Sequence, residues 1–107
     1  MVEMKNDKYR RARGGKAFMI HLICKCGTKV LYYQKDGDGR LKRCYLNRIF
    51  APAELEKLQY GNLAISEISA LRCLKCQVVL GTPIVHHDGR TAFRLRPGFY
   101  AVQRQTN

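Results

Sequence analysis

The sequence predicts a small, mostly β domain with one short helix, in which hairpins are clamped together by two pairs of cysteines. Short runs rich in β-branched and aromatic residues recur between Gly and Pro turn signals, which is typical of strands. Only residues 52–60 carry the signals of a helix. The chain has 107 residues, a length that suits one domain with a small core.

Strands are expected wherever apolar runs end at turn residues: 18–23, 29–35, 40–46, 68–72, 78–80, 83–86, 91–96 and 99–102. The second and third of these are separated by Asp-Gly-Asp-Gly at 36–39. Because Asp-Gly favours the turns that close hairpins, we predict a hairpin between residues 29–35 and 40–46.

The helix predicted at residues 52–60 has a recognisable start and stop. Pro52 suits the first turn, Glu54 and Glu56 suit the positive N-terminal end, and Gly61 suits the position after the last turn. We expect this helix to be an insertion between the two cysteine pairs.

The five cysteines stand at positions 24, 26, 44, 73 and 76. An odd number, without a secretory signal, argues against a disulfide framework and favours the cytoplasm. Two close pairs are what a tetrahedral metal ion needs, so we predict one structural zinc ion bound by Cys24, Cys26, Cys73 and Cys76. Gly27 helps, because a sharp turn after the second cysteine requires a positive φ.

The sequence leaves other roles open for these residues. Cys44 lies in a predicted strand, where it is either a packed small residue or a ligand that replaces Cys24, whose pair has a gap of only one residue. His21, His86 and His87 are further metal candidates. The pairs could also be buried hydrophobes or a redox pair, but a redox CxxC opens a helix in a βαβ unit, and none is predicted there.

The chain is strongly basic. It has 20 Lys and Arg against eight Asp and Glu, a formal charge of +12, which four thiolates and one Zn²⁺ would lower to about +10. Residues 51–76 are neutral, with three basic and three acidic groups. Such a charge favours a polyanionic partner, although it could serve solubility alone. We expect residues 1–16 to be a flexible basic arm and residues 17–107 to form the zinc-bound domain.

Two stretches resemble a group of small bacterial and archaeal zinc-ribbon proteins of unassigned function. They are Cys-Gly-Thr-Lys-Val-Leu-Tyr-Tyr at 26–33 and Gly-Arg-Leu-Lys-Arg-Cys-Tyr-Leu-Asn-Arg-Ile at 39–49. The similarity spans residues 20–98. It implies hairpins held by structural zinc and implies no activity, because function cannot be read from such a fold.

We expect the protein to bind nucleic acid, with RNA or the ribosome as partner. Basic side chains would contact phosphates, and Tyr32, Tyr33, Tyr45 or Phe99 would stack on unpaired bases. The basic candidates are Arg10, Arg11, Arg13, Arg40, Lys42, Arg43, Arg48, Arg94 and Arg96.

A protein-interaction adaptor is the alternative function, with the helix at 52–60 and the apolar Leu63 and Ile65 as its surface. We do not expect an enzyme, because four cysteine ligands leave a zinc ion no open position for water. The catalytic alternatives are a nucleophilic Cys44 beside Arg43 and Lys42, and His86, His87 and Asp88 as acid or base groups, for which the sequence shows no partner. No run is long enough to span a membrane, and we expect no small-molecule substrate.

Overall fold

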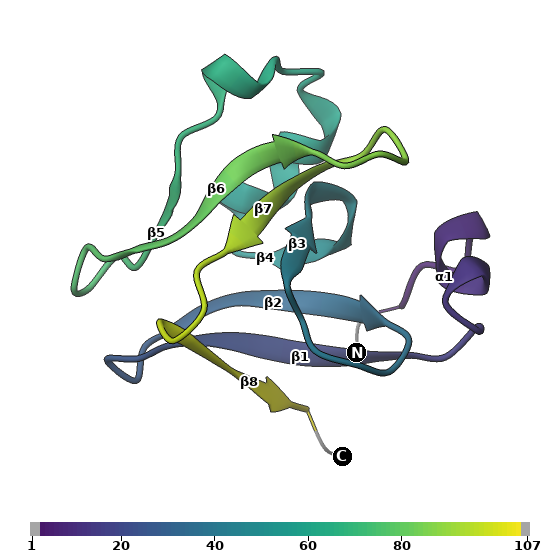
Figure 1. Cartoon of the computed structure of the whole chain (residues 1–107), viewed down its shortest axis with the longest axis horizontal. Coiled ribbons are helices and arrows are strands. Elements are labelled where there is room, and N and C mark those ends of the chain that lie inside the picture. The colour runs from purple at the N-terminus through teal and green to yellow at the C-terminus, as the bar shows by residue number, and fades with distance from the viewer. Residues whose placement is uncertain (1–2, 106–107) are drawn as a thin grey trace.

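The computed structural model describes residues 3–105, and these contain two four-stranded antiparallel sheets (Figure 1). The first sheet has the order β4-β2-β1-β8, formed by Ile49–Ala51, Lys29–Asp36, Ala17–Cys24 and Tyr100–Arg104. The second has the order β3-β7-β6-β5, formed by Arg43–Tyr45, Thr91–Leu95, Val79–Val85 and Leu71–Arg72. The mostly β fold predicted from the sequence is confirmed.

The core lies between the two sheets, which Figure 1 shows one above the other. Side chains alternate between the two faces of a strand, and on β1 this alternation buries Ile20 and Leu22. Leu31 of β2 packs in the same cluster, which Leu80 and Phe93 enter from the second sheet. The strand β8 follows β7 in sequence but pairs with β1, so the chain crosses back to the first sheet.

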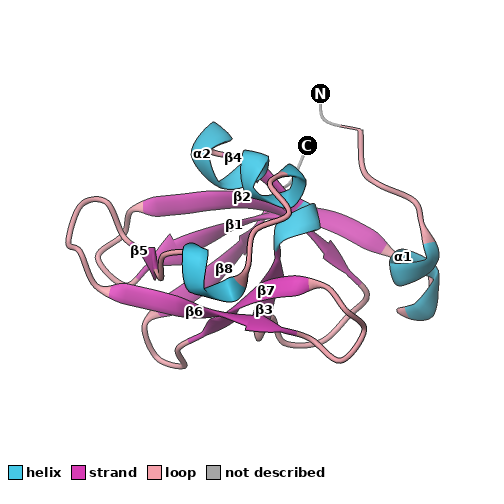
Figure 2. Cartoon of the chain, turned by 90° about the horizontal axis from the view of Figure 1, so that it is seen from above, coloured by secondary structure: helices cyan, strands magenta, loops and turns pink. Residues whose placement is uncertain are grey.

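Helical segments are short, and Figure 2 shows α1 at one end of the molecule, apart from α2. The α-helices are α1, Lys8–Ala12, and α2, Ala53–Glu56; the 3₁₀ segments are η1, Leu46–Arg48, η2, Lys57–Tyr60, and η3, Ile65–Glu67. The helix expected over residues 52–60 is therefore α-helical in its first half and 3₁₀ in its second. Glu54 and Glu56 occupy its first turn, as expected.

The predicted hairpin of residues 29–35 and 40–46 does not form. Strand β2 pairs with β1 and β4, whereas β3 pairs with β7, so the turn at 36–39 carries the chain from one sheet to the other. The side chain of Tyr33 takes the place of a backbone partner, because its hydroxyl accepts a 2.8 Å hydrogen bond from the Tyr45 amide. The Tyr45 amide of β3 thus has a side-chain acceptor in place of the backbone carbonyl that a β2–β3 hairpin would have supplied.

The N-terminal segment, which the sequence predicts to be a basic arm, contacts Gln34 of β2 and Arg48 of η1. The buried Gln34 side chain exchanges hydrogen bonds with the Lys5 backbone, at 2.6 and 2.8 Å. Asp7 accepts hydrogen bonds from the amides of Tyr9 and Arg10 at the start of α1. The same carboxylate binds Arg48, whose side chain is only 1% exposed. These contacts connect the N-terminal segment to β2 and η1.

We predict that Asp7→Asn lowers the free energy of unfolding by about 1–2 kcal/mol, because buried Arg48 loses a charged partner. The hydrogen bond from Arg48 lowers the pKa of Asp7 to about 2, from an ordinary value of 3.8. Since the folded pKa is the lower one, this stabilisation is complete above about pH 4 and is lost as the pH falls towards 2. Denaturant melts at several pH values measure the difference.

Asp38→Asn is the matched control, because Asp38 is exposed and has no ion pair within residues 3–105. This variant should unfold at the same denaturant concentration as the unmodified chain. Equal stability of the Asp7 and Asp38 variants at pH 7 would contradict the role given to Asp7.

Candidate metal centre

Because side chains alternate between the two faces of a strand, one cysteine of each pair lies on the core side of its sheet. Cys24 continues the buried row of β1 that begins with Ile20 and Leu22, and it is 1% exposed. Cys73 continues β5 in the same way after buried Leu71. The second cysteine of each pair lies within the turn that follows and is exposed. Each pair thus joins the inner face of a strand to the molecular surface.

Both pairs lie in turns with the same hydrogen-bonding pattern. In the β1–β2 turn, the Cys24 amide donates to the Thr28 carbonyl and the Gly27 amide donates to the Cys24 carbonyl, each at 2.8 Å. In the β5–β6 turn, the Cys73 amide donates to Val78 at 3.0 Å, and the Gln77 amide donates to Cys73 at 2.9 Å. The second turn is therefore one residue longer, which accounts for the unequal spacing of the two pairs.

The residue after each second cysteine has a positive φ, 95° at Gly27 and 68° at Gln77. Glycine reaches this region without strain, whereas glutamine rarely does. The Gln77 backbone is held by its bond to Cys73 and by its carbonyl, which accepts from the Arg72 side chain at 3.2 Å. The Gly27 expectation is confirmed, and the second turn achieves the same shape with a different residue.

The four sulfur atoms meet where the two turns face each other. Cys24 Sγ lies 3.5 Å from Cys76 Sγ, and Cys26 Sγ lies 3.6 Å from Cys73 Sγ. All four lie within 4.8 Å of one another. Sulfurs about 2.3 Å from one tetrahedral ion are about 3.8 Å apart, while a disulfide needs about 2.05 Å. The cluster consists of free thiols that could hold one metal ion.

Hydrogen bonds from backbone amides and from the Thr28 hydroxyl shift the pKa values of these thiols. The hydroxyl and amide of Thr28 lower the pKa of Cys26 to about 6. The amides of Cys76 and Lys75 lower the pKa of Cys73. At Cys24 the Cys26 amide also lowers the pKa, but burial and the neighbouring thiols outweigh it and raise the value to about 12. A divalent cation removes this conflict, because it binds thiolates and displaces their protons.

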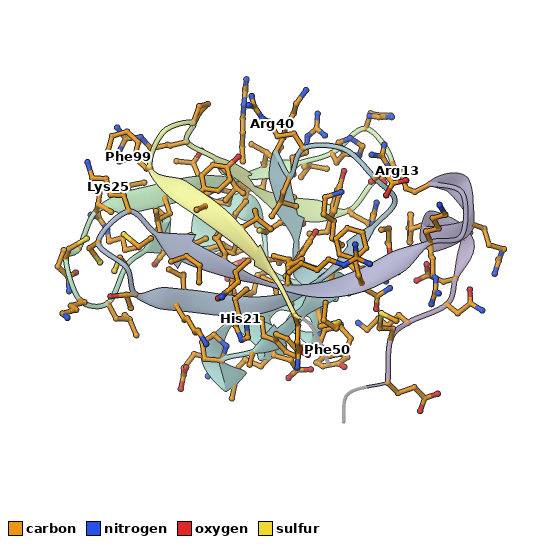
Figure 3. The ribbon with its side chains drawn as sticks, turned by 90° about the horizontal axis from the view of Figure 1, so that it is seen from below. Arg13, His21, Lys25, Arg40, Phe50 and Phe99 are labelled. Carbon is orange, nitrogen blue, oxygen red and sulfur yellow. The ribbon has the colours of Figure 1, made fainter. Side chains whose placement is uncertain are left out.

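Two lysines accompany the cysteines. Lys25 lies between Cys24 and Cys26 in sequence, and Lys75 lies between Cys73 and Cys76. Four thiolates with a divalent ion have a net charge of −2, which these exposed ammonium groups partly offset. Figure 3 shows Lys25 beside Phe99, with its Nζ 4.3 Å from the ring centroid. The β7–β8 turn, residues 96–99, is thereby held against the first cysteine turn.

Cys44 stands apart from this cluster. It is fully buried in the core and pairs with Phe93 across β3 and β7. Burial raises the pKa of the Cys44 thiol, which corrects the idea that Arg43 and Lys42 activate it as a nucleophile. Within residues 3–105, the only group of potential metal ligands is the four-cysteine cluster, so Cys44, His21, His86 and His87 join none.

The predicted phosphate-binding residues fall into three environments. Arg48 is buried and bound to Asp7 and Asp36, so the structure removes it from the set that could reach a phosphate. Arg10 and Arg43 are half-buried, and the Arg10 guanidinium donates to the Gly15 carbonyl at 2.7 Å. The exposed members are Arg11, Arg13, Arg40, Lys42, Arg94 and Arg96.

Four of the predicted residues meet at one cavity of about 630 Å³: Arg13, Arg40, Lys42 and Arg43. The cavity also takes in Tyr9, Lys35 and Arg90, which the sequence reading missed. Nothing in their local sequence marks them, because they come from three segments that only the folded chain brings together.

Comparison with known proteins gives no relative. No family model, curated protein or solved structure matches this chain, so the likeness to zinc ribbons stays a resemblance in motif. Among residues 3–105, no helix has the length and apolar character needed to cross a membrane.

We predict that the purified protein contains about one metal ion per chain and that a chelator unfolds it, because the site forms only when the chain folds. Cys73→Ser should abolish metal binding and the fold. Elemental analysis and circular dichroism measure both effects. A metal-free chain that stays folded would contradict this assignment.

Cys24→Ala and Cys44→Ala form a matched pair, since both remove a buried thiol and only Cys24 belongs to the cluster. Cys24→Ala should lose the metal. Cys44→Ala should keep it and lose about 1–3 kcal/mol of stability through the cavity it leaves. Equal metal loss in both variants would require a different ligand set.

Proposed function

We propose that this chain is a cytoplasmic RNA-binding protein in which one zinc ion serves the fold and has no part in catalysis. Four thiol donors at tetrahedral spacing are the donor set of structural zinc sites. Such sites have four protein ligands and keep no position for a water molecule. The cluster joins the β1–β2 hairpin of the first sheet to the β5–β6 hairpin of the second.

The excess of unpaired cations is the observation that carries the RNA proposal. Within residues 3–105, the ion pairs involve only Arg48, Arg90 and His86 as basic partners. The exposed basic set named above therefore has no carboxylate partner in the described part of the chain. With a formal charge of +12, the protein presents a surface that attracts phosphates.

The fold leaves fewer aromatic side chains available for base stacking than the sequence predicts. Tyr33 is 2% exposed and its hydroxyl is hydrogen-bonded, so it has a structural role. Phe99 lies under the cations of Lys25 and Arg96, at 4.3 and 4.0 Å. The ring of Tyr45 is likewise covered by Arg90, whose guanidinium carbon lies 3.7 Å from its centroid. Half-buried Tyr32 therefore supports the proposal best.

A protein-interaction adaptor is the second candidate, favoured by two exposed apolar side chains. Tyr60 is 73% exposed and Ile65 is 38% exposed. Both lie in the neutral region 51–76, where no excess charge would repel a basic partner. This surface does not depend on the cationic one, so variants can separate the two functions.

We predict that affinity for single-stranded RNA falls steeply with salt. If four to six cations engage phosphates, the log–log slope should lie near −3 to −4, at about −0.7 per phosphate. Arg11→Gln with Arg94→Gln should make the slope shallower by about 1.4, because both side chains are exposed. Fluorescence anisotropy of labelled RNA over a salt series measures the slope.

Lys29→Gln with Lys57→Gln is the control, because it removes the same charge from exposed positions outside the proposed set. Its slope should match that of the unmodified protein. Affinity that is independent of salt, or weaker than about millimolar at low salt, would reject RNA binding. A bound protein partner that is lost on Tyr60→Ser with Ile65→Ser would then favour the adaptor.

A further inference from the structure

The 630 Å³ cavity is bounded by three segments that are distant in sequence. Helix α1 and the residue after it supply Tyr9 and Arg13, the loop between β2 and β3 supplies Arg40 and Lys42, and the β6–β7 turn supplies Arg90. Ligand pockets commonly measure about 300–1,000 Å³, so this cavity has the size of a small-molecule site. Figure 3 shows Arg13 and Arg40 on the same side of the molecule.

The side of the cavity formed by α1 is fixed to the β2–β3 turn. The Gly37 amide donates to the Lys16 carbonyl at 2.8 Å. A side chain at Gly37 would come within 2.9 Å of the Arg13 backbone carbonyl, and Gly37 has a φ of +77°. This position therefore needs glycine for two reasons, close approach and backbone conformation. The contact places Arg13 at the cavity wall.

Another part of the cavity wall is formed by Arg90, which connects α1 to the second sheet. Its guanidinium carbon lies 3.8 Å from the Tyr9 ring centroid and 3.7 Å from that of Tyr45. Asp88 binds the same guanidinium at 2.9 and 3.0 Å. The Nη1 atom of Arg90 is nevertheless buried without a hydrogen-bond partner among the described residues. A buried N–H group without an acceptor destabilises the folded state, so a ligand that supplied an acceptor to Nη1 would gain binding free energy.

The charge of the cavity wall is unbalanced. Six of the lining residues are basic: Arg13, Lys35, Arg40, Lys42, Arg43 and Arg90. The two acidic ones are already engaged, Asp36 by Arg48 and Asp88 by Arg90. Lys35 donates to the Gly37 carbonyl at 2.7 Å. The other four, Arg13, Arg40, Lys42 and Arg43, have no ion-pair partner within residues 3–105. The excess positive charge of the cavity wall therefore favours binding of an anion.

We infer that this cavity binds the terminal phosphate of a nucleotide, supplied by the 5′ end of an RNA strand or by a free nucleotide. A terminal phosphate has a charge of about −1.5 to −2 at pH 7 and three acceptor oxygens, which suits a wall lined by several unpaired cations better than one internal diester does. Arg13 and Arg40 bind the phosphate, and the exposed ring of His87 lies at the wall for base stacking. If the phosphate belongs to the 5′ end of an RNA strand, the inference rests on the RNA binding proposed above. Binding of a free nucleotide does not depend on it.

Calorimetric titration with three probes tests the inference: one single-stranded RNA with a 5′-phosphate, the same RNA with a 5′-hydroxyl, and adenosine monophosphate. The phosphorylated strand should bind about tenfold or more tightly than the hydroxyl strand, because charge-assisted hydrogen bonds are the strong ones. Arg13→Gln with Arg40→Gln should bring this ratio to about one. Lys29→Gln with Lys57→Gln should leave the ratio unchanged, and metal content verifies that both variants are folded.

The outcomes separate this inference from RNA binding itself. Equal affinity for both strands together with no binding of adenosine monophosphate would overturn the inference, even if RNA binding stands. An unchanged ratio in the Arg13 and Arg40 variant would overturn it as well. Adenosine monophosphate that binds the unmodified protein, but not this variant, would support the cavity as a nucleotide site even if neither strand binds.

Discussion

The contact between the two cysteine turns is the constraint on which the rest of the structure depends. Each turn closes a hairpin of a different sheet, and the sulfurs meet across the sheets, Cys24 with Cys76 and Cys26 with Cys73. A chain of this length buries a small core, so a metal ion that joined the two hairpins would contribute stability that packing alone does not supply. Such an ion would also fix how the two sheets face each other.

A second set of interactions organises the charge of the molecule. The carboxylates of Asp7, Asp36 and Asp88 are used on Arg48 and Arg90, inside the fold or at the cavity wall. The eight acidic residues of the chain cannot balance twenty basic ones, and the structure places three of them where they hold segments together. The exposed cations Arg11, Arg13, Arg40, Lys42, Arg94 and Arg96 have no carboxylate partner among residues 3–105.

Arg90 illustrates how one residue joins these two roles. Its stacking between Tyr9 and Tyr45 ties α1 to the second sheet, while Asp7 and Arg48 tie α1 to the first. The helix has five residues and buries none of them, so it is held by polar and cation–π contacts rather than by an apolar face. These contacts place Tyr9, Ala12 and Arg13 of the basic N-terminal segment at the wall of the cavity.

Local spacing in the sequence predicts most of the strands and the grouping of Cys24, Cys26, Cys73 and Cys76, because alternation along β1 and β5 and short gaps between cysteines are local features. The sequence misses β4 and divides β6 into two strands. It could not determine the partner of β2, the burial of Arg48 or the isolation of Cys44. Each of these depends on which distant segment packs alongside. The predicted hairpin at 29–46 was wrong because β1 and β4 already occupy both edges of β2, and the cavity was invisible because its walls meet only through tertiary contacts between α1, the β2–β3 loop and the β6–β7 turn.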